Sequence, residues 1–319
     1  MRQFQAMIID NVPVAPDWRR LSFEWPETLP APVPGQFFTF RPRALDAEGG
    51  GLLRRPLAVA AFADGIAHAV YQLRGPATKT LAASLPGTFL DVIAPLGKGF
   101  PLPERGTGVL LAGGGIGIGP VLYLASELER SGFIPGADYE LILGFRDAAA
   151  IPEFGLSDTG RDHAPADGQS KLDAQSKRGA GILAQLVASA EIRTDDGSAG
   201  FRGTALDGLK EAASRLGRAK IGATGDGGVT ISGGVTKAGA GDAGGILLCA
   251  CGPGPMLAAL AGWARSEGME ARLSAEQWMA CGVGACYGCV LPASAGGYLR
   301  ACTDGPVFDS RDILWEACP

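Results

Sequence analysis

The chain has 319 residues, of which 46% are hydrophobic and 19% are charged, and its formal net charge is −5. This balance is typical of a globular protein that is long enough for two or three domains with buried cores. Because acidic residues are in excess and no block of basic residues is present, nucleic acid and anionic membranes are excluded as the main partners.

The segments that could direct the chain to a membrane are weak. The first residues, MRQFQAMIIDNVPVAPDW, lack the apolar run of a signal peptide. The longest apolar segment, GVLLAGGGIGIGPVLYLA, is interrupted by glycines and a proline, which favours a buried strand, turn and helix. The seven cysteines are odd in number and mostly lie near the C-terminus, which suits thiolate ligands in a reducing compartment. We therefore expect a cytoplasmic protein without a membrane span.

The first third of the chain has the pattern of short strands. Six β-rich runs, among them GQFFTFRP and GIAHAVYQLR, are separated by Pro, Gly and Asp. Regularly spaced short strands of this kind predict an antiparallel β-barrel over residues 1–103.

The pattern changes near Gly108. Strand-like runs such as GVLLAGG, DYELILGF and GILLCACG alternate with helix-like runs such as GPVLYLASELERSG and GPMLAALAGWARSEG. This alternation predicts an α/β domain with a doubly wound parallel sheet over residues 104–274. A small cysteine-bearing domain follows at 275–319.

Two stretches interrupt the α/β pattern. Residues 157–179 are polar without an apolar period, and residues 222–245 are dominated by glycine. Long stretches without a core-forming pattern are unusual inside a compact domain. We expect both to be flexible surface insertions that are dispensable for cofactor binding.

A glycine-rich turn stands between a predicted strand and a predicted helix in VLLAGGGIGIGP. Such glycines let the backbone approach a pyrophosphate, while the helix N-terminus supplies free N–H groups and positive potential. Many glycine-rich turns are only tight turns, so the prediction of a nucleotide site depends on the strand before it and the helix after it. The residues concerned are Gly113, Gly114, Gly115 and Gly117.

A second strand–turn–helix, CACGPGPM, belongs to the same domain. Cys251 ends the strand, where parallel sheets place their ligands, and could lie beside a nicotinamide. A buried structural cysteine is the commoner role for this residue type. Asp195 and Asp196 in TDDGS could accept a hydrogen bond from a ribose hydroxyl, but a solvated Asp-Gly turn explains them equally well.

The predicted barrel contains two candidates for binding a diphosphate. Arg54 and Arg55 enter a strand in LLRRPLAVA, and an arginine fork suits a diphosphate. Gly75 and Thr78 mark a predicted helix start in LRGPATKTLA. Each alone is more often a surface arginine or an ordinary helix cap; together they indicate one anion-binding region.

The cysteines near the C-terminus have the pattern Cys281-x4-Cys286-x2-Cys289-x12-Cys302. This spacing is that of plant-type [2Fe–2S] proteins, in which one loop supplies three ligands. Structural zinc more often takes two separated pairs, so zinc is the main alternative. Glycines at 282, 284 and 288 permit unusual dihedral angles and let backbone N–H groups approach the sulfurs. Cys249 and Cys318 are not needed for this site.

With these residues in place, the chain resembles the electron-transfer subunits of type B dihydroorotate dehydrogenases, within the ferredoxin–NADP reductase superfamily. Four motifs match in order: RRPL, GGGIGIGP, CGPGPM, and MACGVGACYGC with RACTDGPVFD. The first three are shared across the superfamily, and the last is far more specific. Relatives in transhydrogenase-like and sulfide-reducing complexes typically have aspartate where this chain has Cys281.

The resemblance implies an FAD-binding barrel, an NAD-binding domain and a [2Fe–2S] domain. Carried over by position, the flavin site comprises Arg55, Pro56, Leu57, Ala58, Gly75 and Thr78. The nicotinamide nucleotide site comprises Gly113, Gly114, Gly115, Gly117, Cys251, Gly252 and Pro253. The metal site comprises Cys281, Cys286, Cys289 and Cys302. Relatives usually have serine at the position of Ala58, and Pro76 offers no N–H, so the flavin pocket is expected to differ there.

The resemblance also implies the function. A partner subunit with FMN would oxidise dihydroorotate, in a heterotetramer of two plus two subunits, and electrons would pass through the cluster and FAD to NAD⁺. No catalytic triad or carboxylate pair is needed, because the cofactors supply the chemistry. The alternatives are a stand-alone NAD(P)H reductase serving another acceptor and a zinc-binding regulatory protein.

Overall fold

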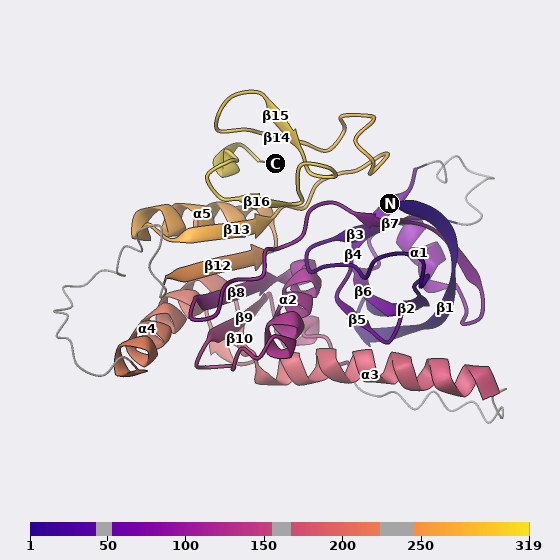
Figure 1. Cartoon of the computed structure of the whole chain (residues 1–319), viewed down its shortest axis with the longest axis horizontal. Helices are drawn as coiled ribbons and strands as arrows, with labels where there is room; N and C mark the ends of the chain where they lie inside the picture. The colour runs from indigo at the N-terminus through magenta and orange to yellow at the C-terminus, as the bar shows by residue number, and fades with distance from the viewer. Residues whose placement is uncertain (43–52, 155–166, 224–244, 319) are drawn as a thin grey trace.

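Figure 1 shows the computed structural model of the chain, which describes residues 1–42, 53–154, 167–223 and 245–318. Two large sheets lie side by side, one near each half of the view, and a small two-stranded sheet projects above them. None of the helices in the described part is long and apolar enough to cross a membrane.

The first sheet is antiparallel throughout, as the sequence predicts, and has the order β4-β3-β7-β1-β2-β6-β5. Its inner side is filled by aromatic and aliphatic residues, with Phe23 and Phe38 in edge-to-face contact at 4.8 Å. The sheet is curled, but in the described residues no ladder joins its edge strands β4 and β5, so it is open rather than a closed barrel. Its strands are β1 (Arg2–Ala15), β2 (Trp18–Glu24), β3 (Phe37–Arg41), β4 (Arg55–Ala58), β5 (Ala61–Ala63), β6 (Ile66–Gln72) and β7 (Phe89–Leu96). Helix α1 (Pro76–Ala82) follows β6.

The second sheet confirms the predicted parallel α/β architecture. Its order is β11-β10-β9-β8-β12-β13-β16, and only β16 runs antiparallel to its neighbour. The strands are β8 (Gly108–Gly114), β9 (Tyr139–Phe145), β10 (Glu191–Thr194), β11 (Phe201–Arg202), β12 (Ile246–Cys251), β13 (Glu270–Ser274) and β16 (Val307–Asp309). Chain order reverses between β8 and β12, which is where doubly wound sheets bind ligands at their carboxyl edge.

Helices cover both faces of this parallel sheet. Helices α2 (Ile118–Arg130) and α3 (Asp167–Ser189) pack on one face, while α4 (Ala205–Ala223) and α5 (Gly254–Glu267) pack on the other. Buried β8 alternates accordingly: Val109 and Leu111 join one core, and Leu110 and Ala112 the other. Short 3₁₀ turns occur at Gly115–Gly117, Ala148–Ala150 and Trp315–Ala317.

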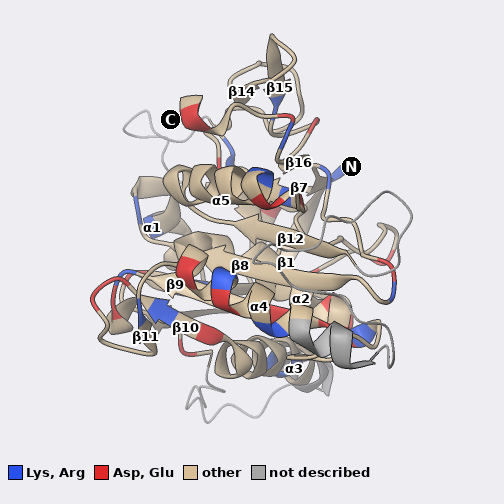
Figure 2. Ribbon diagram, turned by 90° about the vertical axis from the view of Figure 1, so that its left-hand side faces the viewer, with Lys and Arg blue, Asp and Glu red and all other residues tan. Residues whose placement is uncertain are grey.

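The C-terminal residues are divided between two places. Strands β14 (Val290–Pro292) and β15 (Tyr298–Arg300) form the separate hairpin, whereas β16 completes the parallel sheet beside β13. In Figure 2 the hairpin rises above α5, on the side of the molecule away from α3. The same view shows acidic and basic residues interspersed along α4.

The first predicted insertion is partly wrong. Residues 167–179 are helical, because α3 begins at Asp167 and its first half packs against the antiparallel sheet. The polar composition of this stretch hid the helix, since it packs on polar rather than apolar neighbours. Residues 155–166, and 224–244 in the second predicted insertion, lie outside the described residues.

Candidate functional site

The four predicted ligand cysteines lie near one another. Cys286 influences the pKa of the Cys281 thiol, and Cys289 and Cys281 both influence the pKa of the Cys302 thiol. The first three belong to the loop between β13 and β14, and Cys302 directly follows β15. Cys289 and Cys302 are buried, while Cys286 is exposed.

Backbone N–H groups of the same loop point at these sulfurs. The N–H of Val283 donates to Cys281 Sγ and that of Gly288 to Cys286 Sγ, each at 3.4 Å. Burial opposes ionisation of Cys281, but this donation and the other donors of the loop outweigh it and lower the pKa of Cys281 to about 7. For Cys302, burial and the neighbouring Cys289 raise the pKa to about 11. The loop therefore favours the thiolate at Cys281, whereas the surroundings of Cys302 favour its protonated form.

The spacing of the cysteines favours one of the two candidate metals. A [2Fe–2S] cluster takes two protein ligands on each of its irons, whereas structural zinc draws four donors around one ion. Three ligands in one loop with a fourth farther along the chain are the plant-type [2Fe–2S] pattern, so the cluster stays the prediction for these four thiols.

The glycines of the loop have different roles. Gly282 and Gly284 have φ of +71° and +82°, the left-handed region that favours glycine. Gly288, expected to have the same role, has no positive φ; a Cβ there would lie 3.4 Å from Cys286 Sγ. The third left-handed residue of the loop is Tyr287, at 57°.

The cysteine loop rests on the antiparallel sheet. A Cβ on Gly282 would lie 2.8 Å from Thr39 Cγ2, so the loop approaches strand β3 closely. Thr39 pairs with Pro56 of β4, the strand that carries the RRPL motif. The Thr39 hydroxyl is buried and has no hydrogen-bond partner among the described residues. The predicted metal site and the predicted flavin strand thus share one neighbour.

The two arginines of RRPL differ in their surroundings. Arg54 is mostly buried and forms an ion pair with Asp91 of β7 at 2.6 Å. Among the residues that the structure describes, Arg55 donates to the backbone carbonyls of Leu53 and Arg54 alone. Since Arg54 already has an anionic partner, Arg55 is the arginine whose charge is left for a diphosphate.

The polar groups at the helix start near Gly75 largely bond to one another. Thr78 Oγ1 accepts from the N–H groups of Arg74 and Gly75, at 3.0 and 3.2 Å. The Thr78 hydroxyl also donates to the Gly75 carbonyl. The side chain of Thr78 therefore acts as a local cap, and a diphosphate here would be bound mainly by backbone groups of the turn.

A large cavity of about 820 Å³ opens at the carboxyl edge of the parallel sheet, as predicted for the nucleotide. Of the predicted residues, Gly114, Gly115 and Pro253 line it. The others lie behind this surface. A Cβ on Gly117 would lie 2.3 Å from the Cys251 carbonyl oxygen, so the two glycine turns are in contact.

Cys251 is buried beside Ser274, and burial raises the pKa of its thiol to about 12. The thiol is therefore neutral at physiological pH. It suits a packing role next to the cavity and not that of a nucleophile or metal ligand.

Only one of the two candidate aspartates lines the cavity. Asp195 lies on its wall, whereas Asp196 accepts from the N–H and hydroxyl of Ser198. The turn between them and α4 is fixed by Thr194, whose Oγ1 donates to the Ala199 carbonyl at 2.7 Å and accepts from its N–H at 3.2 Å. Asp195 is thus held in place by its neighbours.

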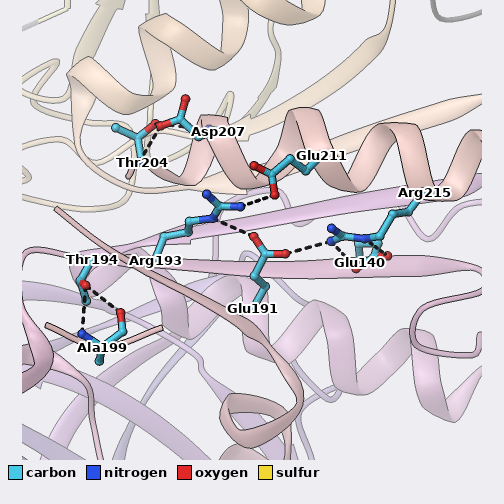
Figure 3. Close-up of polar contacts among 9 residues, drawn as sticks. All are labelled: Glu140, Glu191, Arg193, Thr194, Ala199, Thr204, Asp207, Glu211 and Arg215. Carbon is cyan, nitrogen blue, oxygen red and sulfur yellow. Dashed lines mark hydrogen bonds and ion pairs between the residues drawn. The ribbon is translucent and has the colours of Figure 1, made fainter. Parts of the chain in front are cut away.

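Helix α4 begins at the cavity and is held along its length by ion pairs between side chains, as Figure 3 shows. Its start is capped by Thr204 and Asp207, whose side chains exchange hydrogen bonds with each other's backbone. Further along, Arg193 links Glu191 to Glu211, and Arg215 links Glu140 to Glu191. These partners come from β9, β10 and α4 and hold the helix N-terminus at the cavity wall.

Several cavity residues were missed from the sequence. Arg146 and Asp147 follow β9, and Thr204 precedes α4; polar residues just after parallel strands are a signal that could have found them. Asp17 and Trp18 also line the cavity, although they belong to the β1–β2 turn and the start of β2 in the other sheet. No local pattern indicates that contribution, because it depends on how the two sheets pack.

An antiparallel sheet, a nucleotide-type parallel sheet and a cysteine loop define a protein of the ferredoxin–NADP reductase fold with an added cysteine-bearing domain. The chain superposes on the structure of an NADH-dependent reduced ferredoxin–NADP oxidoreductase with a TM-score of 0.65 at 24% identity, covering 98% of this chain and 90% of that one. It also superposes on the ferredoxin–NADP⁺ reductase of Neisseria gonorrhoeae, with a TM-score of 0.52 at 17% identity, covering 84% and 92%.

Sequence comparison is more specific. Residues 276–314 match the family model of the iron–sulfur cluster binding domain of dihydroorotate dehydrogenase B. The chain is 32% identical, over 98% of both chains, to the dihydroorotate dehydrogenase B (NAD(+)) electron transfer subunit of Shouchella clausii. The corresponding subunit of Desulforamulus reducens is 29% identical, again over 98% of both chains. The chain belongs to the family of dihydroorotate dehydrogenase B electron transfer subunits.

Proposed function

We propose that this chain takes electrons from a dihydroorotate-oxidising partner that carries FMN and passes them through a [2Fe–2S] cluster and FAD to NAD⁺. Its place would be in pyrimidine biosynthesis, in the cytoplasm, where thiolate ligands remain reduced. Residues 1–103 would bind FAD, 104–274 NAD and 275–319 the cluster.

The observation that carries this proposal is the contact of Gly282 with Thr39. It places the loop of the four cysteines against β3, whose ladder partner β4 carries the flavin motif. The orphaned, buried hydroxyl of Thr39 also lies at this junction. A cluster held by this loop and a flavin held by β4 would therefore be neighbours, as electron transfer between them requires.

The assignment of side chains follows from their surroundings. Arg55 would neutralise the flavin diphosphate, since Arg54 is paired with Asp91. Strand β4 and the Gly75 turn would hold the rest of the flavin through the residues Pro56, Leu57, Ala58, Gly75 and Thr78. The cluster would be held by Cys281, Cys286, Cys289 and Cys302.

On the nucleotide side, Gly114, Gly115 and Pro253 would contact NAD directly, because they line the cavity. Gly113, Gly117, Cys251 and Gly252 would act behind it by allowing the two turns to pack. The bound flavin supplies the exchange between single electrons and hydride. The chain's own groups bind and orient the nucleotide, and Cys251 stays a neutral thiol.

The partner would bind at the exposed edge of the cysteine loop. Cys286 is exposed there, and three aromatic side chains stand in solvent around β14 and β15. Trp278 is 88% exposed, and the guanidinium of Arg300 lies 5.1 Å from the ring centre of Tyr287. Exposed aromatic and arginine side chains are characteristic of binding surfaces. We place the FMN subunit here, with two copies of each subunit in the complex.

Reconstitution tests this function. The purified chain is expected to carry FAD, with two irons and two acid-labile sulfides as the cluster formula requires. Alone it should reduce dyes with NADH and should not oxidise dihydroorotate; adding the FMN subunit should create dihydroorotate-dependent NAD⁺ reduction. Stoichiometric zinc without flavin would overturn the proposal. Dye reduction with no gain from the FMN subunit would favour a reductase for another acceptor.

A further inference from the structure

Helix α3 extends beyond the sheet to which it belongs. Its second half places Leu183 and Leu186 in the buried core with α2, beside the parallel sheet. Its first half contacts β1, β5 and β6 of the antiparallel sheet. Figure 1 shows the helix lying under both sheets, and the cysteine loop is on the opposite side of the molecule.

The surface beneath the first half of α3 is polar. Asp10, Ser22 and His68 face one another across β1, β2 and β6 in register. Ser22 Oγ donates to Asp10 Oδ1 at 2.9 Å and lies 2.9 Å from His68 Nδ1. Arg20 forms an ion pair with Asp10 at 3.0 Å. Since the serine proton goes to Asp10, the His68 ring must donate through Nδ1.

Helix α3 packs on these three polar residues and adds contacts of its own. The Ser176 hydroxyl donates to Asp10 Oδ2. Two residues further along the same helix, Arg178 forms an ion pair with Asp64 of the β5–β6 turn at 2.8 Å. Ser22 and His68 are fully buried in consequence, on the side of their strands away from the antiparallel core.

Gly179 makes the closest approach. A Cβ at this position would lie 2.0 Å from His68 Nε2, an atom that is buried and without a partner in the described part of the chain. Only a residue without a side chain lets the helix backbone lie on the imidazole. Gly181, two residues on, would meet nothing within 4 Å and so has no such requirement.

We propose that the first half of α3 is a strap that fixes the flavin-binding sheet against the nucleotide-binding sheet, with Ser176 and Gly179 as positioning residues for hydride transfer between FAD and NAD. The strap rests on strand β6, which leads into the Gly75 turn. The second half of α3 packs on α2, which follows the glycine turn of the nucleotide cavity. The strap therefore connects the strand that leads into the proposed flavin site with the helix that follows the proposed nucleotide turn. This inference rests on the proposed FAD and NAD sites.

Gly179→Ala tests the strap, with Gly181→Ala as its matched control. Alanine is a better helix former than glycine, so a free helix should be stabilised by either change. We expect Gly181→Ala to raise the melting temperature and Gly179→Ala to lower it, with faster amide exchange over residues 172–189 only in the latter. FAD content should be unchanged. The rate of FAD reduction at saturating NADH should fall about tenfold in Gly179→Ala, since small misplacements of reacting groups are costly, while KM for NADH stays the same.

Rescue separates positioning from general damage. His68→Ala combined with Gly179→Ala removes the imidazole that the new methyl group meets, and should restore most of the lost rate and stability. If Gly179→Ala does not fold, Ser176→Ala is the second variant and should give a smaller fall in the same rate. A Gly179→Ala protein that behaves like Gly181→Ala overturns the strap; one that is destabilised but reduces FAD normally overturns its positioning role. Absence of FAD from the unaltered chain would instead overturn the proposed function.

Discussion

The cysteine loop and the nucleotide turn are both rich in glycine, but the structure uses the glycines for different reasons. In the loop, Gly282 and Gly284 have left-handed backbones that other residues adopt only at a cost. In the turn, Gly117 has an ordinary backbone but no room for a Cβ, because the Cys251 carbonyl is too close. Gly115 is the reverse, with φ of +52° and open space around it.

This difference shows that one sequence signal has two physical sources. A left-handed glycine shapes its own loop and brings N–H groups to nearby sulfurs. A close-packed glycine joins two turns that are far apart in the chain. Substitutions should therefore damage the two regions in separable ways, and the expected effects below run from the largest to the smallest.

Loss of a cluster ligand should have the largest effect and should be confined to the cysteine loop. Cys302→Ser removes a buried thiol, and we expect cluster iron to be lost and dihydroorotate-dependent NAD⁺ reduction to fall by roughly 100-fold or more, since affinity depends on the full ligand set. NADH-to-dye activity should persist. Iron analysis and both assays measure this. Cys318→Ser is the control, and iron loss there with retention in Cys302→Ser would show that the fourth ligand is misassigned.

Gly117→Ala should weaken binding of the nucleotide. Its methyl group would meet backbone atoms of Cys251 and Gly252, which cannot move aside as a side chain can. Overpacking of this kind costs about 1–3 kcal/mol, and we expect KM for NADH to rise roughly tenfold or more, with iron content unchanged. Gly136→Ala is the control: Gly136 has a left-handed φ of +75° and open space around it but does not line the cavity, so the change has only the backbone cost of about 1–2 kcal/mol. Equal KM values in the two variants would contradict the packing explanation.

Gly282→Ala should test the loop in the complementary way. It combines backbone strain of about 1–2 kcal/mol with a contact against Thr39, so iron occupancy after purification should drop while NADH-to-dye activity is retained. Gly288→Ala, which has neither feature, should keep its iron. Adding Thr39→Ser to Gly282→Ala removes the opposing methyl group and should recover part of the occupancy. No recovery would mean that backbone strain alone governs the loop.

Asp195→Asn should give the smallest effect, a change in KM for NADH that leaves the cysteine loop untouched. Replacing a carboxylate acceptor that lines the cavity should raise KM for NADH about fivefold, the equivalent of one modest hydrogen bond. Asp196→Asn is the control, because that carboxylate is already bound to Ser198. Steady-state kinetics with a dye acceptor measure both. Equal KM values for the two variants would place the ribose elsewhere.

The antiparallel sheet and the parallel sheet that follows it were correctly predicted from the sequence, and the four-cysteine site stays a prediction; both rest on local patterns. Strand alternation around β8 and β9 and the spacing from Cys281 to Cys289 are visible within short windows. The first half of α3 was missed for the opposite reason. Its stabilising neighbours, Asp10 and His68, are more than a hundred residues away, and their polarity left no apolar period on the helix.

The sequence alone determined which chemistry the chain can host, since thiol spacing, the glycine turn and the RRPL motif are set by covalent order. Tertiary structure decided how those groups are used. It brought Cys302 to the cysteine loop, paired Arg54 with Asp91 but not Arg55, and brought Asp17 of one sheet to the cavity of the other. The reason is physical: residue types and local spacing fix what can bind, whereas distances between remote segments arise only when the sheets pack and bury their shared core.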